Sequence, residues 1–214
     1  PLLMPDNFSD LHLCGWRIEM GDVGPENPLL EGDLPWNSGG VGAHSSVFYD
    51  PREEIWRAYL MCTRPETSSK EWSSQWNTPS HGYRHLCYFE SDDGIEWRAP
   101  ELGFYPWEDR QDTNALFDLH EGSSQYASIL LLENDPDWQY EMFILREPSA
   151  FAQPFNGYGY YRYRSRDAKK WELWDGPIVD PMSGDLAFFY RDNGKYVSYY
   201  RLALERREGD HVPI

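Results

Sequence analysis

The sequence predicts an all-β protein built from repeated antiparallel sheets, and three features indicate it. Short apolar and aromatic runs alternate with clusters of Gly, Pro, Asp and Asn, and no stretch has convincing helical periodicity. One hairpin motif, Ser-x-Asp followed a few residues later by Trp, occurs at both 91–97 and 165–171. The same order of strands precedes each copy. Because repeated units of this kind share one continuous core, we expect the blades of a β-propeller.

The first copy of the motif shows how each residue fits a hairpin. Residues 85–89 form an apolar and aromatic run typical of a strand. In the turn at 91–94 the Asp side chains can bond the backbone, and Gly94 supplies positive φ. Ile95 and Trp97 then point to one face of a second strand. A side-chain-capped turn with a Trp anchor accounts for every residue, so we interpret the motif as structural.

Each repeat opens with two strands joined by a tight turn, and the motif hairpin closes it. The opening pairs are expected at 45–49 with 55–62, at 127–132 with 140–145, and at 186–190 with 196–200. Two loops, 63–82 and 146–157, lie between the opening pairs and the motif hairpins; the first is long and polar, and long loops of this kind are often functional.

Four antiparallel strands per repeat define the expected domain organisation. Residues 1–35 are a lead-in segment, and blades follow at 36–105, at 106–178 and, incompletely, at 179–214. The chain therefore covers roughly two and a half to three blades, whereas a propeller needs at least four. We expect the remaining blades to lie beyond Ile214 in a longer protein.

Composition narrows the class of partner. The formal net charge is −17, the opposite of what a nucleic-acid-binding surface requires. No window is apolar enough for a membrane helix, and no leader precedes the first repeat. Aromatic residues make up 16% of the chain, which suits both a propeller core and surfaces that stack on sugars. Nothing in the sequence indicates an oligomeric state.

The chain has three cysteines, Cys14, Cys62 and Cys87, and two redox states are open for the last two. Cys62 and Cys87 lie on strands expected to be neighbours, so they form either a cross-strand disulfide or two buried free thiols. No Cys-x-x-Cys or His-rich spacing indicates zinc, and no cofactor is predicted.

Propeller topology brings the beginnings of the first strands of all blades to one face. Acids around an aromatic-lined pocket on that face suit glycoside hydrolysis, which uses one carboxyl as acid and a second as nucleophile or base. We expect Asp185 and Glu121 to be this pair. The expected substrate-binding residues are His44, Trp36, Tyr126, Arg146, Trp72 and Trp76.

Each of these residues also has a structural interpretation. Asp185 can cap the turn after Gly184, and Glu121 can be a solvated residue of a Gly-rich link. His44 can be a satisfied polar residue below the pocket, and Arg146 can pair with a carboxylate of the protein. Trp36, which follows Pro35, can belong to the core.

Two stretches carry a resemblance to a known family. The run from Tyr88 to Gly103, Tyr-Phe-Glu-Ser-Asp-Asp-Gly-Ile-Glu-Trp-Arg-Ala-Pro-Glu-Leu-Gly, resembles the blade hairpin of the glycoside hydrolase family 32 N-terminal-like proteins, in particular a poorly characterised bacterial branch. Glu-Asn-Pro-Leu-Leu at 26–30, with Pro-Trp at 35–36, and the stretch from Asp185 to Val197 are similar to the same branch. The resemblance implies a five-bladed propeller of the kind shared with arabinanase-type glycosidases.

The sequence departs from that family at the catalytic motifs. The Trp-Met-Asn-Asp-Pro-Asn-Gly nucleophile motif is absent, as are Arg-Asp-Pro and Glu-Cys. The catalytic assignment of Asp185 and Glu121 therefore rests on position alone. We expect an extracellular or periplasmic glycosidase that degrades a polysaccharide or its oligosaccharides. The alternatives are a non-catalytic carbohydrate-binding propeller and a structural one. An acidic channel would also suit Ca²⁺, for which no motif is present.

Overall fold

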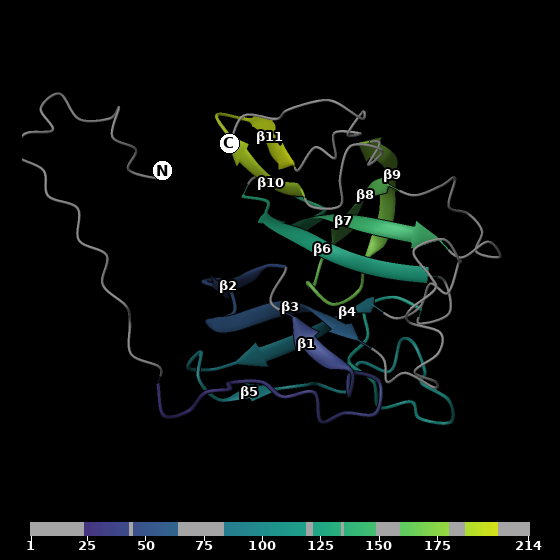
Figure 1. Ribbon diagram of the computed structural model, residues 1–214. Helices are drawn as coiled ribbons and strands as arrows, with labels where there is room; N and C mark the ends of the chain where they lie inside the picture. The colour runs from purple at the N-terminus through teal and green to yellow at the C-terminus, as the bar shows by residue number, and fades with distance from the viewer. Residues whose placement is uncertain are drawn as a thin grey trace, which may run out of the picture.

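The computed structural model describes residues 24–42, 45–63, 84–118, 122–133, 135–148, 159–179 and 187–200. Over these ranges every regular element is a β-strand, and the strands form three antiparallel sheets (Figure 1). Because these ranges contain no helix, they also contain none that could cross a membrane.

The first sheet has a split first strand. Both β1 and β2 pair with β3, so they act as two halves of one strand, and the sheet continues from β3 through β4 to β5. All pairings in this sheet are antiparallel. The strands are β1 (Gly40–Gly42), β2 (Val47–Asp50), β3 (Ile55–Thr63), β4 (Arg84–Ser91) and β5 (Trp97–Arg98).

The second and third sheets repeat this order. The second runs β6-β7-β8-β9, and β10 and β11 form the third. In the turn between β10 and β11, Asn193 and Gly194 have φ values of 47° and 77°, which is the backbone that an Asn-Gly hairpin turn favours. The strands are β6 (Gly122–Leu131), β7 (Tyr140–Pro148), β8 (Gly159–Ser165), β9 (Glu172–Val179), β10 (Ala187–Asp192) and β11 (Lys195–Tyr200).

The sheets pack face to face, with the second sheet between the first sheet and the β10–β11 hairpin (Figure 1). Along β7, Met142 and Ile144 point into the core shared with the first sheet. Phe143 and Leu145 point to the opposite face and pack with Phe189 of β10. Because both faces of β7 are covered, its sequence reads as a continuous apolar run rather than an alternating one.

The outer face of the first sheet is closed by two segments of its own chain. Residues 30–41 and 97–115 contribute side chains to a core that includes Leu60 and Phe89. The later segment also bonds to β4: the Tyr88 N–H donates to the Asn114 carbonyl, and the Leu116 N–H donates to the Leu86 carbonyl, both at 3.0 Å. Residues 106–115, which were expected in the second blade, therefore pack on the first sheet, whereas Leu116 and Phe117 enter the core between the first and second sheets.

The two copies of the hairpin motif have the same turn chemistry. Asp93 accepts the N–H groups of the second and third residues after it at 2.8 Å, and Asp167 does the same at 2.9 and 2.7 Å. In each turn the Ser hydroxyl two positions earlier donates to that carboxylate at 3.0 Å. Gly94 and Ala168 follow the aspartates with φ values of 81° and 63°. The side-chain-capped turn expected from the sequence is present in both copies.

These turn contacts make a testable contribution to stability. Asp167→Ala is expected to lower the free energy of unfolding by about 1–3 kcal/mol, because two backbone N–H groups lose their acceptor. Urea denaturation followed by fluorescence measures the change. Asp137→Ala removes an exposed carboxyl from the same sheet and is the matched control, with an expected change below ~0.5 kcal/mol. Equal losses in the two variants would contradict the role of Asp167.

A buried charge network joins the first two sheets at the end where β2 meets β3. Asp50 and Arg57 are both fully buried, and Arg57 Nε donates to Asp50 Oδ2 at 2.8 Å. The Tyr140 hydroxyl, on the second sheet, donates to the same oxygen at 2.6 Å. Arg57 also donates to the Tyr88 hydroxyl and forms an ion pair with Glu53 at 2.7 Å. Burial alone would raise the pKa of Asp50, but the bonds from Tyr140 and Arg57 outweigh it and hold this pKa below its ordinary value.

Removing the carboxylate from this network should be costly. Asp50→Ala removes the fully buried carboxylate from the Arg57 guanidinium, leaving only the half-exposed Glu53 carboxylate beside it, and is expected to lower the free energy of unfolding by about 3–5 kcal/mol. Asp92→Ala, whose carboxyl is 80% exposed, is the control and should cause a much smaller loss. Because the folded pKa of Asp50 lies below the unfolded value of ~3.9, its contribution is present above that pH and lost as the pH falls through the folded pKa. Denaturation at several pH values should therefore show a shallower acid dependence in Asp50→Ala; an unchanged dependence would contradict the assignment.

Candidate functional site

The first strands of the first and second sheets are joined through two serine hydroxyls. Ser46 Oγ accepts the Ile129 N–H at 2.9 Å and donates to the Ala127 carbonyl at 3.1 Å. Ser45 Oγ accepts the Ala127 N–H at 3.0 Å. These atoms of β6 face away from β7, so the hydroxyls satisfy the edge of β6 that has no strand beside it. The order of the contacts makes this segment and β6 run in the same direction.

The second and third sheets are joined in the same way. Ser128 Oγ, on β6, accepts the Phe189 N–H of β10 at 3.1 Å. The Tyr160 hydroxyl accepts the Ala187 N–H at 2.7 Å, which satisfies a second amide of β10. Ser46 and Ser128 thus hold equivalent places in successive sheets, and the same contact repeats along the stack of sheets.

An irregularity occurs next to the equivalent serine in both sheets. In the first sheet the register against β3 shifts by two residues between Gly42, which pairs with Met61, and Val47, which pairs with Ala58. Between Gln125 and Ser128, two residues of β6 oppose one of β7. Tyr126 lies in this second bulge with φ of 56° and packs half-buried against the core shared with β10. Bulges redirect side chains and are frequent beside active sites, so this level of the strands is the candidate site.

A buried polar group lies on the side of the bulge where β6 begins. We call Arg84, Ser124, Gln125 and Arg146 the strand-start cluster. Ser124 pairs with Arg146 across β6 and β7, and Arg84 Nη1 donates to Gln125 Oε1 at 3.1 Å. The Arg146 guanidinium is fully buried and lies 4.4 Å from the centre of the Phe117 ring. Of the two guanidinium groups, that of Arg84 is partly exposed and can orient hydroxyl or carboxylate oxygens of a bound molecule, whereas that of Arg146 is covered.

Two of the residues expected at the site, Tyr126 and Arg146, lie on neighbouring strands but on opposite faces of the second sheet. Tyr126 packs toward the core shared with β10, and Arg146 lies on the Phe117 ring in the core shared with the first sheet. Five expected residues fall outside the described ranges: Glu121, Asp185, His44, Trp72 and Trp76.

Because the serine contact recurs, residues of different repeats can be compared by their distance in sequence from it. His44 and Tyr126 each precede the equivalent serine by two residues. Asp185 precedes Phe188, the matching position of β10, by three residues. His44 and Tyr126 therefore stand at the same residue count from the repeated contact, and Asp185 stands one position earlier.

The side chain of Trp36 is buried in the core and is not exposed in a pocket. Its side chain is 2% exposed and packs in the core on the outer face of the first sheet. The indole Nε1 donates to Asn114 Oδ1 at 2.7 Å, and the Arg110 guanidinium lies 5.3 Å from the ring centre. Stacking on a sugar needs a ring face open to solvent, so the stacking role expected for Trp36 is replaced by the core role.

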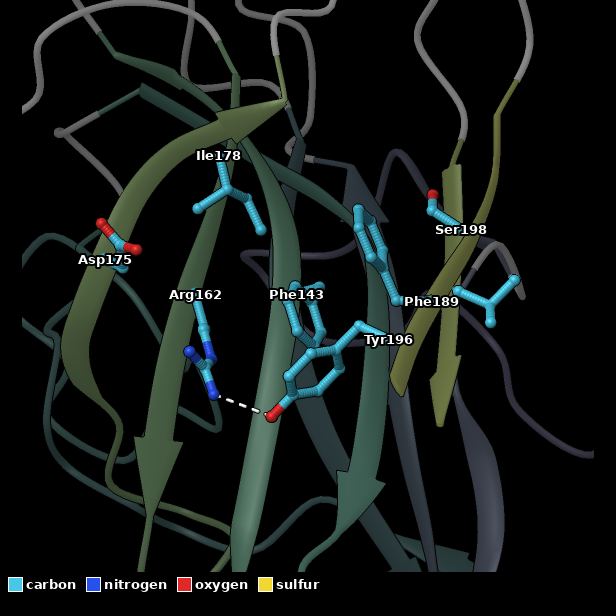
Figure 2. Close-up of a pocket in the computed structure, with 8 residues that line it drawn as sticks. Phe143, Arg162, Asp175, Ile178, Phe189, Tyr196 and Ser198 are labelled. Atoms are coloured by element: carbon cyan, nitrogen blue, oxygen red, sulfur yellow. Dashed lines mark hydrogen bonds between the residues drawn. The ribbon is translucent and has the colours of Figure 1, made fainter. Parts of the chain in front are cut away.

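A separate hollow of about 280 Å³ lies between the second sheet and β10–β11 (Figure 2). Phe143, Phe189 and Ile178 make its wall largely apolar, and Arg162 donates to the Tyr196 hydroxyl at 2.8 Å across it. Asp175 is the single carboxylate among the residues that line it. The residues that line this hollow therefore do not supply the two carboxyls that glycoside hydrolysis uses.

The contacts that build the site were not predicted from sequence. Ser45 and Ser46 were assigned to a strand without a role, and Gln125 and Arg84 were not singled out. The available signal was a pair of small hydroxyl residues at the start of an apolar run, repeated as Ser-Ser at 123–124 and Ser128 in the second sheet. Because their partners belong to other sheets, the sequence alone does not reveal them.

Comparison with known proteins assigns no family. No protein-family model matches the chain, and no curated protein sequence has significant similarity to it. The resemblance described above therefore rests on its motif residues alone.

The serine contacts can be tested by substitution. Ser46→Ala is expected to lower the free energy of unfolding by about 1–3 kcal/mol, because the Ile129 N–H and the Ala127 carbonyl lose their partner in the interior. Chemical denaturation measures the loss. Ser38→Ala removes an exposed hydroxyl and should leave stability nearly unchanged. If Ser46→Ala were as stable as Ser38→Ala, the hydroxyl would not be what joins the sheets.

Proposed function

We propose that this protein is part of a five-bladed β-propeller that hydrolyses glycosidic bonds in a polysaccharide or its oligosaccharides, outside the cell or in the periplasm. The observation that supports the proposal is the repeated contact at Ser46 and Ser128. It joins the first strands of successive antiparallel sheets, as expected where blades surround a common axis. In such an arrangement, residues that precede the first strands of different blades converge on one pocket.

The proposed acids are Glu121 and Asp185. Glu121 directly precedes β6 in the sequence, and Asp185 precedes β10 by two residues. β6 and β10 are in contact through Ser128. We assign the two carboxyls as the general acid and the nucleophile or base.

The chemistry requires the two carboxyls to be in different protonation states. The protonated carboxyl gives its proton to the leaving glycosidic oxygen, and the ionised one attacks the anomeric carbon or removes a proton from water. The net reaction adds one water across the C–O bond. Guanidinium groups such as Arg84 and Arg146 favour ionisation of a nearby carboxyl, so the acid closer to the strand-start cluster is assigned the ionised role.

The remaining expected residues are assigned to substrate binding. Tyr126 contributes from the bulge level of β6, together with His44, Trp72 and Trp76. Trp36 and Arg146 are omitted because their side chains are covered.

Enzyme assays with variants test the proposal. Reducing-end release from levan, arabinan and laminarin is measured for the wild type, Asp185→Asn, Glu121→Gln and Asp192→Asn. Each of the first two variants should lose at least about 10²-fold in turnover, the usual contribution of a general acid or base, with an unchanged melting temperature. Asp192→Asn removes an exposed charge from the β10–β11 turn and should retain activity.

Three outcomes would contradict the proposal. Full activity in Asp185→Asn or Glu121→Gln would reject that residue as catalytic. Calorimetric binding of oligosaccharides of these polymers, without any product, would instead favour a non-catalytic carbohydrate-binding propeller, which the missing nucleophile motif also suggests. Folded protein with neither binding nor turnover would leave a structural role.

A further inference from the structure

Two cysteines and a histidine meet on the outer face of the first sheet. Cys62 lies on β3, and His85 and Cys87 lie on β4. The strand register pairs Cys62 with His85 and Leu60 with Cys87. Because alternate residues of a strand share a face, all three side chains project to the same side of the sheet. Their sulfur and ring nitrogen atoms all lie within 4.8 Å of one another.

The three side chains are enclosed by apolar groups. Cys62 and Cys87 are 0% exposed, and His85 is 1% exposed. Both cysteines are free thiols, which decides between the two alternatives left by the sequence. Phe89 and Trp107 are members of the surrounding core, and Ala115 lies opposite Cys87 in a β-bridge. Burial, together with the bond to Cys62, raises the pKa of the Cys87 thiol well above its ordinary value.

The donor set selects for a soft metal ion. Thiolate and imidazole groups favour Zn²⁺ and Cu(I), whereas Ca²⁺ and Mg²⁺ require oxygen ligands. Two thiolates and one neutral imidazole around Zn²⁺ give a net charge of zero, but around Cu(I) they give one negative charge. An apolar interior penalises uncompensated charge, so the neutral zinc set is favoured.

The geometry is close to that of a zinc site. Bond lengths of about 2.3 Å to sulfur and 2.0–2.1 Å to nitrogen place tetrahedral donors roughly 3.5–3.8 Å apart. The observed limit of 4.8 Å between donor atoms therefore requires a contraction of at most about 1.0–1.3 Å. Rotation of the cysteine side chains can supply this contraction without a change in the strand register.

We propose that Cys62, His85 and Cys87 form a structural Zn²⁺ site that ties β3 to β4. On binding, each thiol releases one proton and forms a sulfur–zinc bond, and one imidazole nitrogen supplies a neutral third ligand. No electron transfer is involved. A water molecule would complete the tetrahedron, as in other zinc sites with three protein ligands. The site is separate from the strand-start cluster and does not depend on the proposed hydrolase activity.

Metal titration of the full chain tests the site. The protein is reduced, stripped of metal with a chelator and titrated with Zn²⁺ alone. We expect one Zn²⁺ per chain by mass spectrometry of the folded protein. At a free Zn²⁺ concentration about 100-fold above Kd, the melting temperature should rise by roughly 5–10 °C. Titration with Co²⁺ should produce the intense thiolate-to-metal absorption band that oxygen and nitrogen ligands do not give.

Cysteine variants show whether the expected ligands bind the metal. Cys62→Ala and Cys87→Ala should each abolish the Co²⁺ absorption band and the thermal shift, whereas Cys14→Ala, which removes the third cysteine of the chain, should keep both. Where a variant fails to fold, the wild-type titration decides. Absence of stoichiometric Zn²⁺ binding by reduced, folded wild type would overturn the proposal. Binding of Cu(I) without Zn²⁺, loss of zinc binding in Cys14→Ala, or a native Cys62–Cys87 disulfide would overturn it as well.

Discussion

The arrangement of the sheets depends on how the free edge of each first strand is satisfied. β6 and β10 begin their sheets, so the backbone groups on their outer edges have no neighbouring strand to pair with. Buried N–H and C=O groups need partners, and an unpaired edge invites association with other strands. Hydroxyls of Ser45 and Ser46 satisfy β6, and those of Ser128 and Tyr160 satisfy β10. Side chains thus replace the missing ladder, and they fix where each sheet lies against the next.

This constraint leaves the two ends of the sheets with different tasks. At the end where β2 meets β3, Asp50, Arg57 and Tyr140 form a closed network that joins two sheets and has its charges paired. At the opposite end, the bulge around Tyr126 and the strand-start cluster keep polar groups near the beginnings of the first strands. The end with the paired charges of Asp50 and Arg57 therefore acts as the scaffold, and the end with the bulge at Tyr126 carries the candidate site. Such a division between scaffold and site is common.

The sequence predicted the hairpins better than the contacts between them. Turn chemistry is local, so the turns at Asp93 and Asp167 could be predicted from the residues around them. The apolar runs predicted the bounds of β3 and β4 to within about two residues. β6 begins at Gly122 instead of 127 because its polar start reads as a loop until its pairing with β7 is known. β9 was expected as the last strand of the second repeat but without bounds, because Gly176 and Pro177 interrupt its pattern. The strand-start cluster and the Cys62–His85–Cys87 group join residues distant in sequence, and no local pattern identifies such groups.

Amide hydrogen exchange, resolved by residue with NMR, tests most directly whether side-chain hydroxyls join the first strands of the sheets. If the serine hydroxyls join the sheets, the Ile129 and Phe189 amides should exchange only through global unfolding, as slowly as amides within the β3–β4 ladder. Ser46→Ala should then accelerate exchange at Ile129 while Phe189 stays protected. Rapid exchange of both amides in a wild-type protein whose β3–β4 ladder remains protected would contradict this role of the hydroxyls.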